Sequence, residues 1–237
     1  MRIPPCASCS FSRGNWYYTY MPSVRVNDVD MYYEIHGDGE PLVLIVGLAT
    51  DISEWEGIIR WLAKKYKVLA FDNRGAGRTD KPDAHYSIEM MANDTAGLMQ
   101  TLGIEQAHIL GISMGGRIAL ALALRQPKRV KKLILVSTSA RSIKNWRSHF
   151  FSILSSVTIL RSKYPQPRYA FNRQRQAYFT YNGTDKLQEL QIPTVIMHGK
   201  KDKVVPYRLA EELHAGIKGS KMLTFAGGHL FFFMKEH

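Results

Sequence analysis

The chain has 237 residues, of which 45% are apolar and 22% are charged, and it carries a formal net charge of +12. These proportions suit a single globular domain with a full hydrophobic core and argue against an intrinsically disordered protein. No apolar run approaches the roughly 18 residues that a membrane-spanning helix needs. Residues 1–20 also lack the apolar segment of a signal peptide, so a cytoplasmic protein is expected.

Residues 1–20 contain the only two cysteines of the chain, Cys6 and Cys9. A C-x-x-C pair can bind zinc or cycle between redox states, but either role needs a second ligand pair or a strand-helix context. Neither accompanies this pair. We therefore expect residues 1–20 to be a disordered extension without a metal site.

Short apolar runs typical of buried β-strands recur along the chain, and amphipathic helical patterns follow most of the later runs. Strands are expected at residues 24–26, 31–35, 42–46, 68–71, 107–111, 132–136, 194–198 and 221–225. Asn27 and Asp28, between the first two runs, predict a hairpin turn. The alternation predicts an α/β protein with a mostly parallel central sheet and helices on both of its faces.

Helices are expected at residues 54–65, 87–101, 114–124 and 209–217. The first pattern places Trp55, Ile58, Ile59 and Leu62 on one face. Ser87 is a suitable N-cap for the second helix, which Gly103 would end. The third is small and apolar, as expected of a helix buried against a sheet.

The positive charge is concentrated in one third of the chain. Residues 106–184 contain 14 Lys and Arg but no Asp or Glu, whereas the remainder holds 18 basic and 20 acidic residues, a net of −2. Residues 142–190 also break the strand-helix alternation. We expect a short, basic, helical lid at 142–190, inserted after the sixth strand into a core made of residues 21–141 and 191–237.

The sequence Gly111-Ile112-Ser113-Met114-Gly115 places a serine between an expected strand and an expected helix. A serine hydroxyl is a poor nucleophile at neutral pH and needs a base and a rigid, exposed position. A sharp strand-to-helix turn supplies that position, and flanking glycines leave room for it. Ser113 is therefore the candidate nucleophile.

The acid partner must lie outside residues 106–184, because that stretch has no carboxylate. Asp202 follows the strand expected at 194–198, where it would stand at the carboxyl edge of the sheet. Its role would be to orient a histidine and stabilise the imidazolium. Asp185 is the alternative candidate.

His229 follows the last expected strand through Gly227 and Gly228, which allow a loop to bend the imidazole over the sheet edge. Histidine is the natural proton carrier near neutral pH, so His229 is the candidate base. The other histidines lack such a setting and are expected to be surface or packing residues: His36, His85, His108, His149, His198, His214 and His237.

Two backbone N–H groups would have to stabilise a tetrahedral oxyanion. The N–H of Met114 follows the nucleophile directly, and Leu48, after the strand at 42–46, is the best candidate for the second donor. Gly75-Ala76-Gly77 lacks the third glycine of a dinucleotide-binding loop, and neither a Walker lysine nor H-E-x-x-H is present. No metal or organic cofactor is expected.

In these motifs the chain resembles the α/β-hydrolases, and most closely their enol-lactonase, carboxylesterase and perhydrolase (cofactor-free haloperoxidase) branch. The likeness runs from about residue 24 to the end of the chain, and residues 71–82 are similar to the branch signature that follows the fourth strand. The resemblance implies Ser113 as nucleophile, Asp202 as acid and His229 as base. It also implies an oxyanion hole formed by Leu48 and Met114.

Three features depart from the pattern of these families. Val46 stands where many members have a histidine, and the lid is shorter than usual. The chain ends eight residues after His229, where a final helix usually follows. We therefore expect residues 230–233 to be exposed.

Hydrolysis of a carboxylic ester or lactone through an acyl-serine is the leading functional hypothesis. An aspartate nucleophile, needed for dehalogenation or epoxide opening, is absent at position 113. The alternatives are an enol-lactonase whose anionic substrate is held by Arg168, Arg173 and Arg175, a perhydrolase, and a low-turnover ligand receptor. The expected partner is a small-molecule substrate, not nucleic acid. Contact of residues 149–160 with an anionic membrane surface is a weaker hypothesis.

Overall fold

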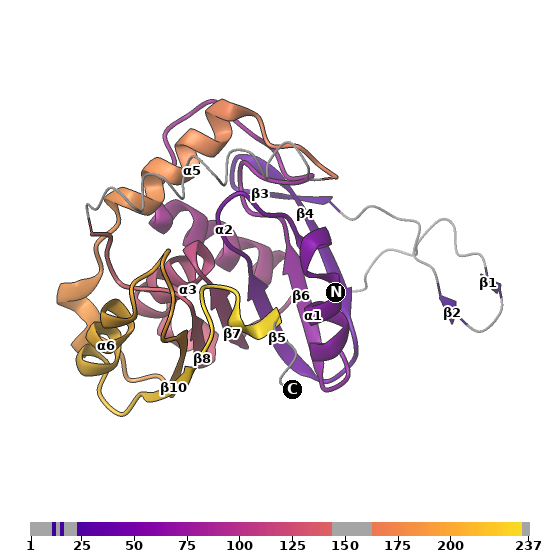
Figure 1. Ribbon diagram of the computed structural model, residues 1–237. Helices are drawn as coiled ribbons and strands as arrows, with labels where there is room; N and C mark the ends of the chain where they lie inside the picture. Colours follow the sequence, from indigo (N-terminus) through magenta and orange to yellow (C-terminus); the bar gives the residue numbers. More distant parts are fainter. Residues whose placement is uncertain (1–10, 13–14, 17–22, 144–162, 234–237) are drawn as a thin grey trace.

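A computed structural model of the protein describes residues 11–12, 15–16, 23–143 and 163–233 (Figure 1). Its centre is an eight-stranded sheet with the order β10-β9-β8-β7-β5-β6-β4-β3. Strand β4 pairs antiparallel with β3 and β6, and the other neighbours pair in parallel. The strands are β3 (Ser23–Val26), β4 (Val29–His36), β5 (Glu40–Ile45), β6 (Tyr66–Phe71), β7 (Ala107–Ile112), β8 (Val130–Val136), β9 (Thr194–Gly199) and β10 (Lys221–Phe225). The expected mostly parallel sheet is confirmed.

The hairpin expected at Asn27 and Asp28 joins β3 to β4, with Val26 opposite Val29. Asn27 takes the left-handed conformation (φ 53°) that a tight hairpin turn requires. Upstream, β1 (Phe11–Ser12) and β2 (Asn15–Trp16) pair antiparallel as a separate two-stranded sheet. The stretch expected to be disordered therefore includes local strand pairing, while Cys6 and Cys9 lie outside the described residues.

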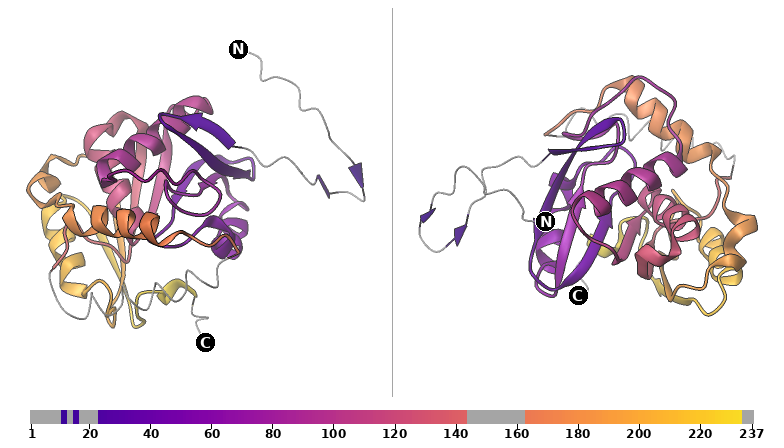
Figure 2. Two further views of the ribbon diagram at one scale, coloured as in Figure 1. Left: turned by 90° about the horizontal axis from the view of Figure 1, so that it is seen from above. Right: turned by 180° about the vertical axis from the view of Figure 1, so that it is seen from behind.

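Alternating side chains of the central strands point to opposite faces of the sheet and belong to two separate apolar layers. Val43 and Ile45 of β5 pack with the cluster that includes α2 and α3, whereas Leu42 and Leu44 pack with the cluster that includes α1. Helices α2 and α3 lie side by side over one face and α1 covers the other (Figures 1 and 2). The helices are α1 (Glu56–Leu62), α2 (Ile88–Thr101), α3 (Met114–Arg125), α5 (Arg168–Thr180) and α6 (Tyr207–Gly216).

The helix expected at residues 54–65 is shorter and has a different beginning. A 3₁₀ helix, η1 (Ile52–Trp55), precedes α1, and α1 ends at Leu62. The turn between β4 and β5 packs against the backbone that follows: a Cβ at Gly39 would lie 2.0 Å from the Lys65 carbonyl oxygen. Residues 63–65 therefore form the turn that leads into β6 at Tyr66, and the helix ends at Leu62, three residues before the end of the expected helix.

The segment between β8 and β9 contains α5 and a 3₁₀ helix, η3 (Thr184–Glu189), as expected of a helical insertion. Tyr169 of α5 donates a hydrogen bond to the carbonyl oxygen of Lys81, 2.7 Å away, which ties the insertion to the loop after β6. Residues 144–162, with the hypothetical membrane contact at 149–160, lie outside the described residues. Among the helices described, none has the length and apolar character that crossing a bilayer requires.

The apolar run that follows His229 is less exposed than expected. Leu230 is 51% exposed, but Phe231 is buried and stacks on Phe225 of β10, with ring centroids 4.3 Å apart. Phe232 stacks on Trp55 at 5.7 Å. The expectation of exposure is therefore wrong for Phe231 and Phe232, because a 3₁₀ turn, η4 (Phe231–Phe233), folds them back onto the layer beside α1.

Candidate active site

Ser113 occupies a strained turn between β7 and α3. Its backbone (φ 56°, ψ −116°) lies in a conformational region that residues other than glycine rarely adopt. Its N–H donates to the Val136 carbonyl oxygen at 2.9 Å, and its own carbonyl oxygen accepts from the Thr138 hydroxyl at 2.6 Å. These bonds hold the strained residue from both sides, and such strain is typical of functional positions.

The glycines that flank Ser113 are required by close backbone contacts. A Cβ at Gly111 would lie 2.4 Å from the Gly115 carbonyl oxygen, and a Cβ at Gly115 would lie 2.0 Å from that of Ile45. Both distances are too short for any side chain. The strand, the turn and the helix can therefore approach one another only with glycine at both positions.

The structure brings Ser113, Asp202 and His229 together at one edge of the sheet. His229 Nε2 lies 3.1 Å from Ser113 Oγ, and His229 Nδ1 lies 2.8 Å from Asp202 Oδ2. The alternative acid, Asp185, is exposed in η3 and has no such contact with His229 in the structure. One imidazole thus contacts both the hydroxyl and the carboxylate.

Asp202 is held by hydrogen bonds on both carboxylate oxygens. The N–H groups of Val204 and Val205 each donate to Oδ1 at 2.8 Å. Burial opposes ionisation, but hydrogen bonds from His198 and His229 outweigh it and lower the pKa of Asp202 to about 2. The carboxylate is therefore ionised at neutral pH and can stabilise a positive charge on His229.

His198 is a site residue that the sequence analysis assigned to packing or the surface. Its side chain is fully buried, and Nε2 lies 2.9 Å from the Val205 carbonyl oxygen and 3.3 Å from Asp202 Oδ2. Both neighbours are hydrogen-bond acceptors, so Nε2 must carry a proton. His198 consequently helps to position the acid through Oδ2, the same carboxylate oxygen that His229 contacts. The only signal in the sequence is its place at the end of a strand, four residues before Asp202.

Replacing His198 by leucine is expected to lower kcat roughly tenfold, since the charged Asp202 loses one donor. Without that donor the carboxylate becomes more basic and holds the proton of His229 more tightly. The acid limb of the kcat/KM–pH profile should therefore move to higher pH. His198→Gln, whose Nε2 can occupy the same place, should restore both quantities. Equal losses in both variants with an unchanged acid limb would assign His198 to packing alone.

The loop that carries His229 is fixed by two residues without a recognisable motif. Ser137, directly after β8, donates its hydroxyl to the His229 carbonyl oxygen at 2.7 Å. Gly199, at the end of β9, lets this loop approach the acid loop: a Cβ there would lie 2.4 Å from the Gly227 carbonyl oxygen. The base is therefore positioned through its backbone as well as through its ring.

The loop expected to supply an oxyanion donor lies against the nucleophile. A Cβ built at Gly47 would be 3.4 Å from the Ser113 Cβ, and Leu48 follows directly. The Asn73 side-chain amide donates to the Val46 carbonyl oxygen at 3.1 Å, which helps to fix the backbone just before Gly47. Ala49, two residues after Gly47, has φ 63° and is a second strained backbone position. The Met114 N–H belongs to the first turn of α3, where N–H groups lack partners within the helix.

The three arginines expected to hold an anionic substrate are distributed along α5. Arg173 pairs with Asp83 at 3.1 Å, and Arg168 is exposed. The Arg175 guanidinium lies 5.9 Å from the Phe179 ring centroid. In the described structure they do not form a common anion-binding cluster.

The sequence model of the alpha/beta hydrolase fold family matches residues 40–176. The chain belongs to this family. The matched region of this α/β-hydrolase includes β5, the turn at Ser113 and part of the insertion. The expected fold family is therefore confirmed, and with it membership of a family of hydrolytic enzymes.

Individual relatives match most of this α/β-hydrolase. A putative carbamate hydrolase RutD from Azorhizobium caulinodans is 28% identical over 245 residues, covering 89% of this chain and 92% of the relative. The enol-lactonase from Burkholderia xenovorans LB400 has a TM-score of 0.76 and 26% identity, covering 88% of this chain and 92% of the lactonase. The esterase EaEST from Exiguobacterium antarcticum has a TM-score of 0.79 and 25% identity, covering 89% and 93%.

Proposed function

We propose that this α/β-hydrolase cleaves carboxylic esters or lactones through an acyl-serine intermediate. The observation that carries the proposal is the position of the His229 imidazole, 3.1 Å from Ser113 Oγ and 2.8 Å from Asp202 Oδ2. Hydrogen-bond contact from hydroxyl to imidazole to carboxylate is the arrangement that activates a serine for attack on a carbonyl.

In the first half-reaction Ser113 Oγ attacks the carbonyl carbon while its proton passes to His229 Nε2. The carbonyl π electrons move to the oxygen, and the N–H groups of Leu48 and Met114 stabilise the resulting oxyanion. Asp202 stabilises the imidazolium. When the tetrahedral intermediate collapses, the bond to the alcohol oxygen breaks and that oxygen takes the proton from His229.

In the second half-reaction a water molecule loses a proton to His229 Nε2 and attacks the acyl-serine carbonyl. Collapse of this intermediate returns the proton to Ser113 Oγ and releases the carboxylic acid. A lactone leaves as one hydroxy acid, because its alcohol and acyl groups belong to one molecule. Each group on the protein returns to its starting state.

Several related reactions use the same groups and differ in one reactant. The name of the Azorhizobium relative indicates carbamate hydrolysis for that protein, and here a carbamoyl-serine would replace the acyl-serine. In a perhydrolase, hydrogen peroxide replaces the water. An enol-lactonase would act on an anionic lactone, and a receptor would acylate once and retain its product.

The proposal is tested with purified protein, a fluorophosphonate probe and a panel of short 4-nitrophenyl esters, simple lactones and carbamates. We expect multiple turnovers on at least one ester or lactone, with activity lost as the probe modifies Ser113 in a peptide identified by mass spectrometry. Peroxide-dependent halide oxidation in acetate would mark a perhydrolase, and a single-turnover burst would mark a receptor. Full activity after labelling, or a label on another residue, would contradict the proposal.

A further inference from the structure

The expected oxyanion donor Leu48 belongs to a strained loop that packs against the nucleophile. This oxyanion loop, residues 46–52, runs from the end of β5 to the start of η1. Gly47 lies against the Ser113 side chain, and Ala49 has φ 63°. A strained backbone persists only where the surrounding structure holds it. The contacts at the two ends of the oxyanion loop therefore decide where the Leu48 N–H points.

The far end of the oxyanion loop is held by the carboxylate of Asp72. The Ile52 N–H donates to Asp72 Oδ1 at 2.9 Å. The backbone N–H and the Nε of Arg78 donate to Oδ2 at 2.8 Å and 3.1 Å. Burial raises the pKa of Asp72, and these three donors oppose that rise because they stabilise the ionised form. The side chain is 0% exposed, so no solvent competes for its hydrogen bonds.

Asp72 is itself fixed at the end of β6. Its N–H donates to the Tyr32 carbonyl oxygen at 3.1 Å, and its carbonyl oxygen accepts from the Thr79 hydroxyl at 2.7 Å. The Arg78 guanidinium lies 3.5 Å from the centroid of the Tyr32 ring, which fixes the second partner of the carboxylate. The carboxylate that contacts the oxyanion loop therefore projects from a backbone held by β4.

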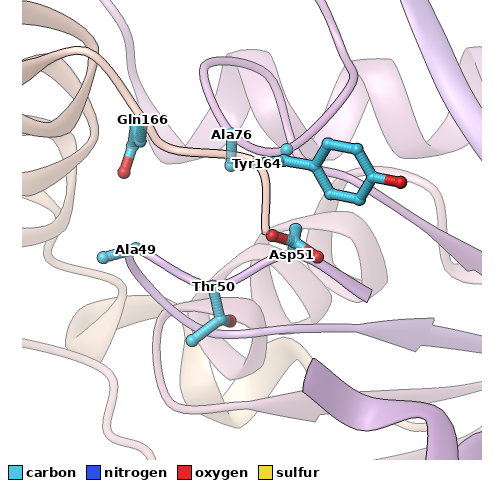
Figure 3. Close-up of a pocket in the computed structure, with 7 residues that line it drawn as sticks. Ala49, Thr50, Asp51, Ala76, Tyr164 and Gln166 are labelled. Atoms are coloured by element: carbon cyan, nitrogen blue, oxygen red, sulfur yellow. The ribbon is translucent and has the colours of Figure 1, made fainter. Parts of the chain in front are cut away.

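Gly77 lets the turn after β6 close over this carboxylate. It has φ 53°, and a Cβ there would lie 2.2 Å from Asp72 Oδ2 and 2.7 Å from the Asp51 Cβ. Figure 3 shows the oxyanion loop, with Ala49 and Asp51, beside the turn that carries Ala76. The glycine-rich turn that does not fit a dinucleotide-binding site thus permits close contact between these two segments.

The near end of the oxyanion loop is held by the residue next to Asp72. Asn73 is 1% exposed, and its side-chain amide donates to the Val46 carbonyl oxygen at 3.1 Å. Two adjacent side chains thus contact the loop at both of its ends. An oxyanion donor must lie about 2.7–3.1 Å from the oxyanion, so a small displacement of either end weakens the hydrogen bond from Leu48.

We propose that Asp72 is a positioning residue for the oxyanion hole, which keeps the Leu48 N–H in place against the nucleophile through its contact with Ile52. Asn73 fixes the other end of the same loop, and neither side chain touches the substrate. This inference rests on the proposed function, because it concerns the oxyanion formed in that reaction.

Asp72→Asn is the first test, because it keeps the size of the side chain and replaces one acceptor by a donor. Both carboxylate oxygens face N–H groups, so the NH₂ group must meet a donor on either side. Arg78 supplies two donors and Ile52 one, so we expect the NH₂ group to face Ile52 and displace the oxyanion loop. The expected result is a roughly tenfold lower kcat on the best ester of the panel with little change in KM, since the oxyanion exists only in the transition state and the intermediates.

The second readout is the inhibition constant of a trifluoromethyl ketone whose chain matches the acyl group of that ester. Ser113 Oγ adds to its carbonyl carbon, and the hemiketal oxyanion occupies the oxyanion hole. We expect this constant to rise roughly tenfold in Asp72→Asn, whereas the constant of the matching methyl ketone, which binds without addition, stays unchanged. Neither constant depends on the fraction of the protein that is folded.

Ile52→Pro tests the same hydrogen bond from the other side, because proline has no N–H to donate to Asp72. Ile52 is the first residue of η1, and the preceding Asp51 is extended (φ −115°, ψ 169°), as a residue before proline must be. We expect the same rise in the constant of the trifluoromethyl ketone as in Asp72→Asn.

Asp94→Asn is the matched control, because it makes the same change in another buried carboxylate. Asp94 is 1% exposed, and its hydrogen bonds in the described structure go to Arg74 and Asn27, outside the oxyanion loop. We expect both ketone constants to keep their wild-type values in Asp94→Asn.

The positioning role would be overturned by an unchanged trifluoromethyl ketone constant in either folded variant, Asp72→Asn or Ile52→Pro. An equal rise for the methyl ketone, or an equal rise in Asp94→Asn, would overturn it as well. Wild-type activity no greater than that of Ser113→Ala on every ester would instead refute the proposed function, and the positioning role with it.

Discussion

Replacement of Ser113 by alanine is expected to lower kcat/KM for short 4-nitrophenyl esters by about 10⁶-fold. The variant keeps His229, Asp202 and the backbone N–H groups but has no oxygen that can form the acyl bond. Residual turnover would come only from binding and from stabilisation of the oxyanion formed by attacking water. Initial rates over a range of substrate concentrations measure the loss, and circular dichroism checks that the variant is folded.

Ser220→Ala provides a control with the same chemical change at another place. Ser220, in the turn between α6 and β10, is hydrogen-bonded to His214 Nδ1 at 2.8 Å and is remote in sequence from the turn at Ser113. Its replacement is expected to leave kcat/KM unchanged. If Ser113→Ala retained more than about a hundredth of wild-type activity, another group would have to be the nucleophile.

The turn at Ser113 could be predicted from the sequence because its requirements are local. An apolar run, a glycine, a serine, a second glycine and a small apolar helix are adjacent in the chain, and each follows from the close contacts seen at Gly111 and Gly115. The acid and base were predicted in the same way, from carboxylate and glycine positions after strands. The structure places all three side chains within hydrogen-bond distance.

Residues that act through non-local contacts could not be predicted in this way. Ser137 contacts the His229 carbonyl oxygen across 92 residues, and Asn73 contacts Val46 across 27. A serine after a strand, or an asparagine in a loop, has many possible partners, and only the folded backbone selects one. His198 looked like an ordinary strand residue for the same reason, although its imidazole contacts the acid loop.

The lid shows that charge composition does not reveal which partner each basic side chain finds. The basic stretch suggested an anion-binding role for Arg168, Arg173 and Arg175, yet Arg173 pairs with Asp83 of the loop before α2. The contacts that hold the backbone of the nucleophile come instead from uncharged groups, such as the Thr138 hydroxyl and the Val136 carbonyl oxygen. Which side chain reaches these backbone groups depends on the folded chain, and that information is absent from composition and charge.

Replacement of Asp202 by asparagine is expected to lower kcat about 10⁴-fold, because the hydrogen bonds around Asp202 dictate how an amide must sit. The N–H groups of Val204 and Val205 face Oδ1, so the amide oxygen has to occupy that side. The NH₂ group then faces His229 Nδ1 and donates to it. The proton of a neutral His229 is thereby forced onto Nε2, beside Ser113 Oγ, where it prevents the imidazole from accepting the hydroxyl proton.

Asp185→Asn is the matched control, since it makes the same change at the other candidate acid, exposed in η3. It is expected to leave kcat unchanged, whereas Asp202→Asn should lose activity with little change in KM, because the carboxylate acts on the imidazolium of the transition state. Steady-state kinetics on one ester with both variants measures the difference. A loss of less than tenfold in Asp202→Asn, or a larger loss in Asp185→Asn, would show that orientation of His229 by Asp202 does not drive catalysis.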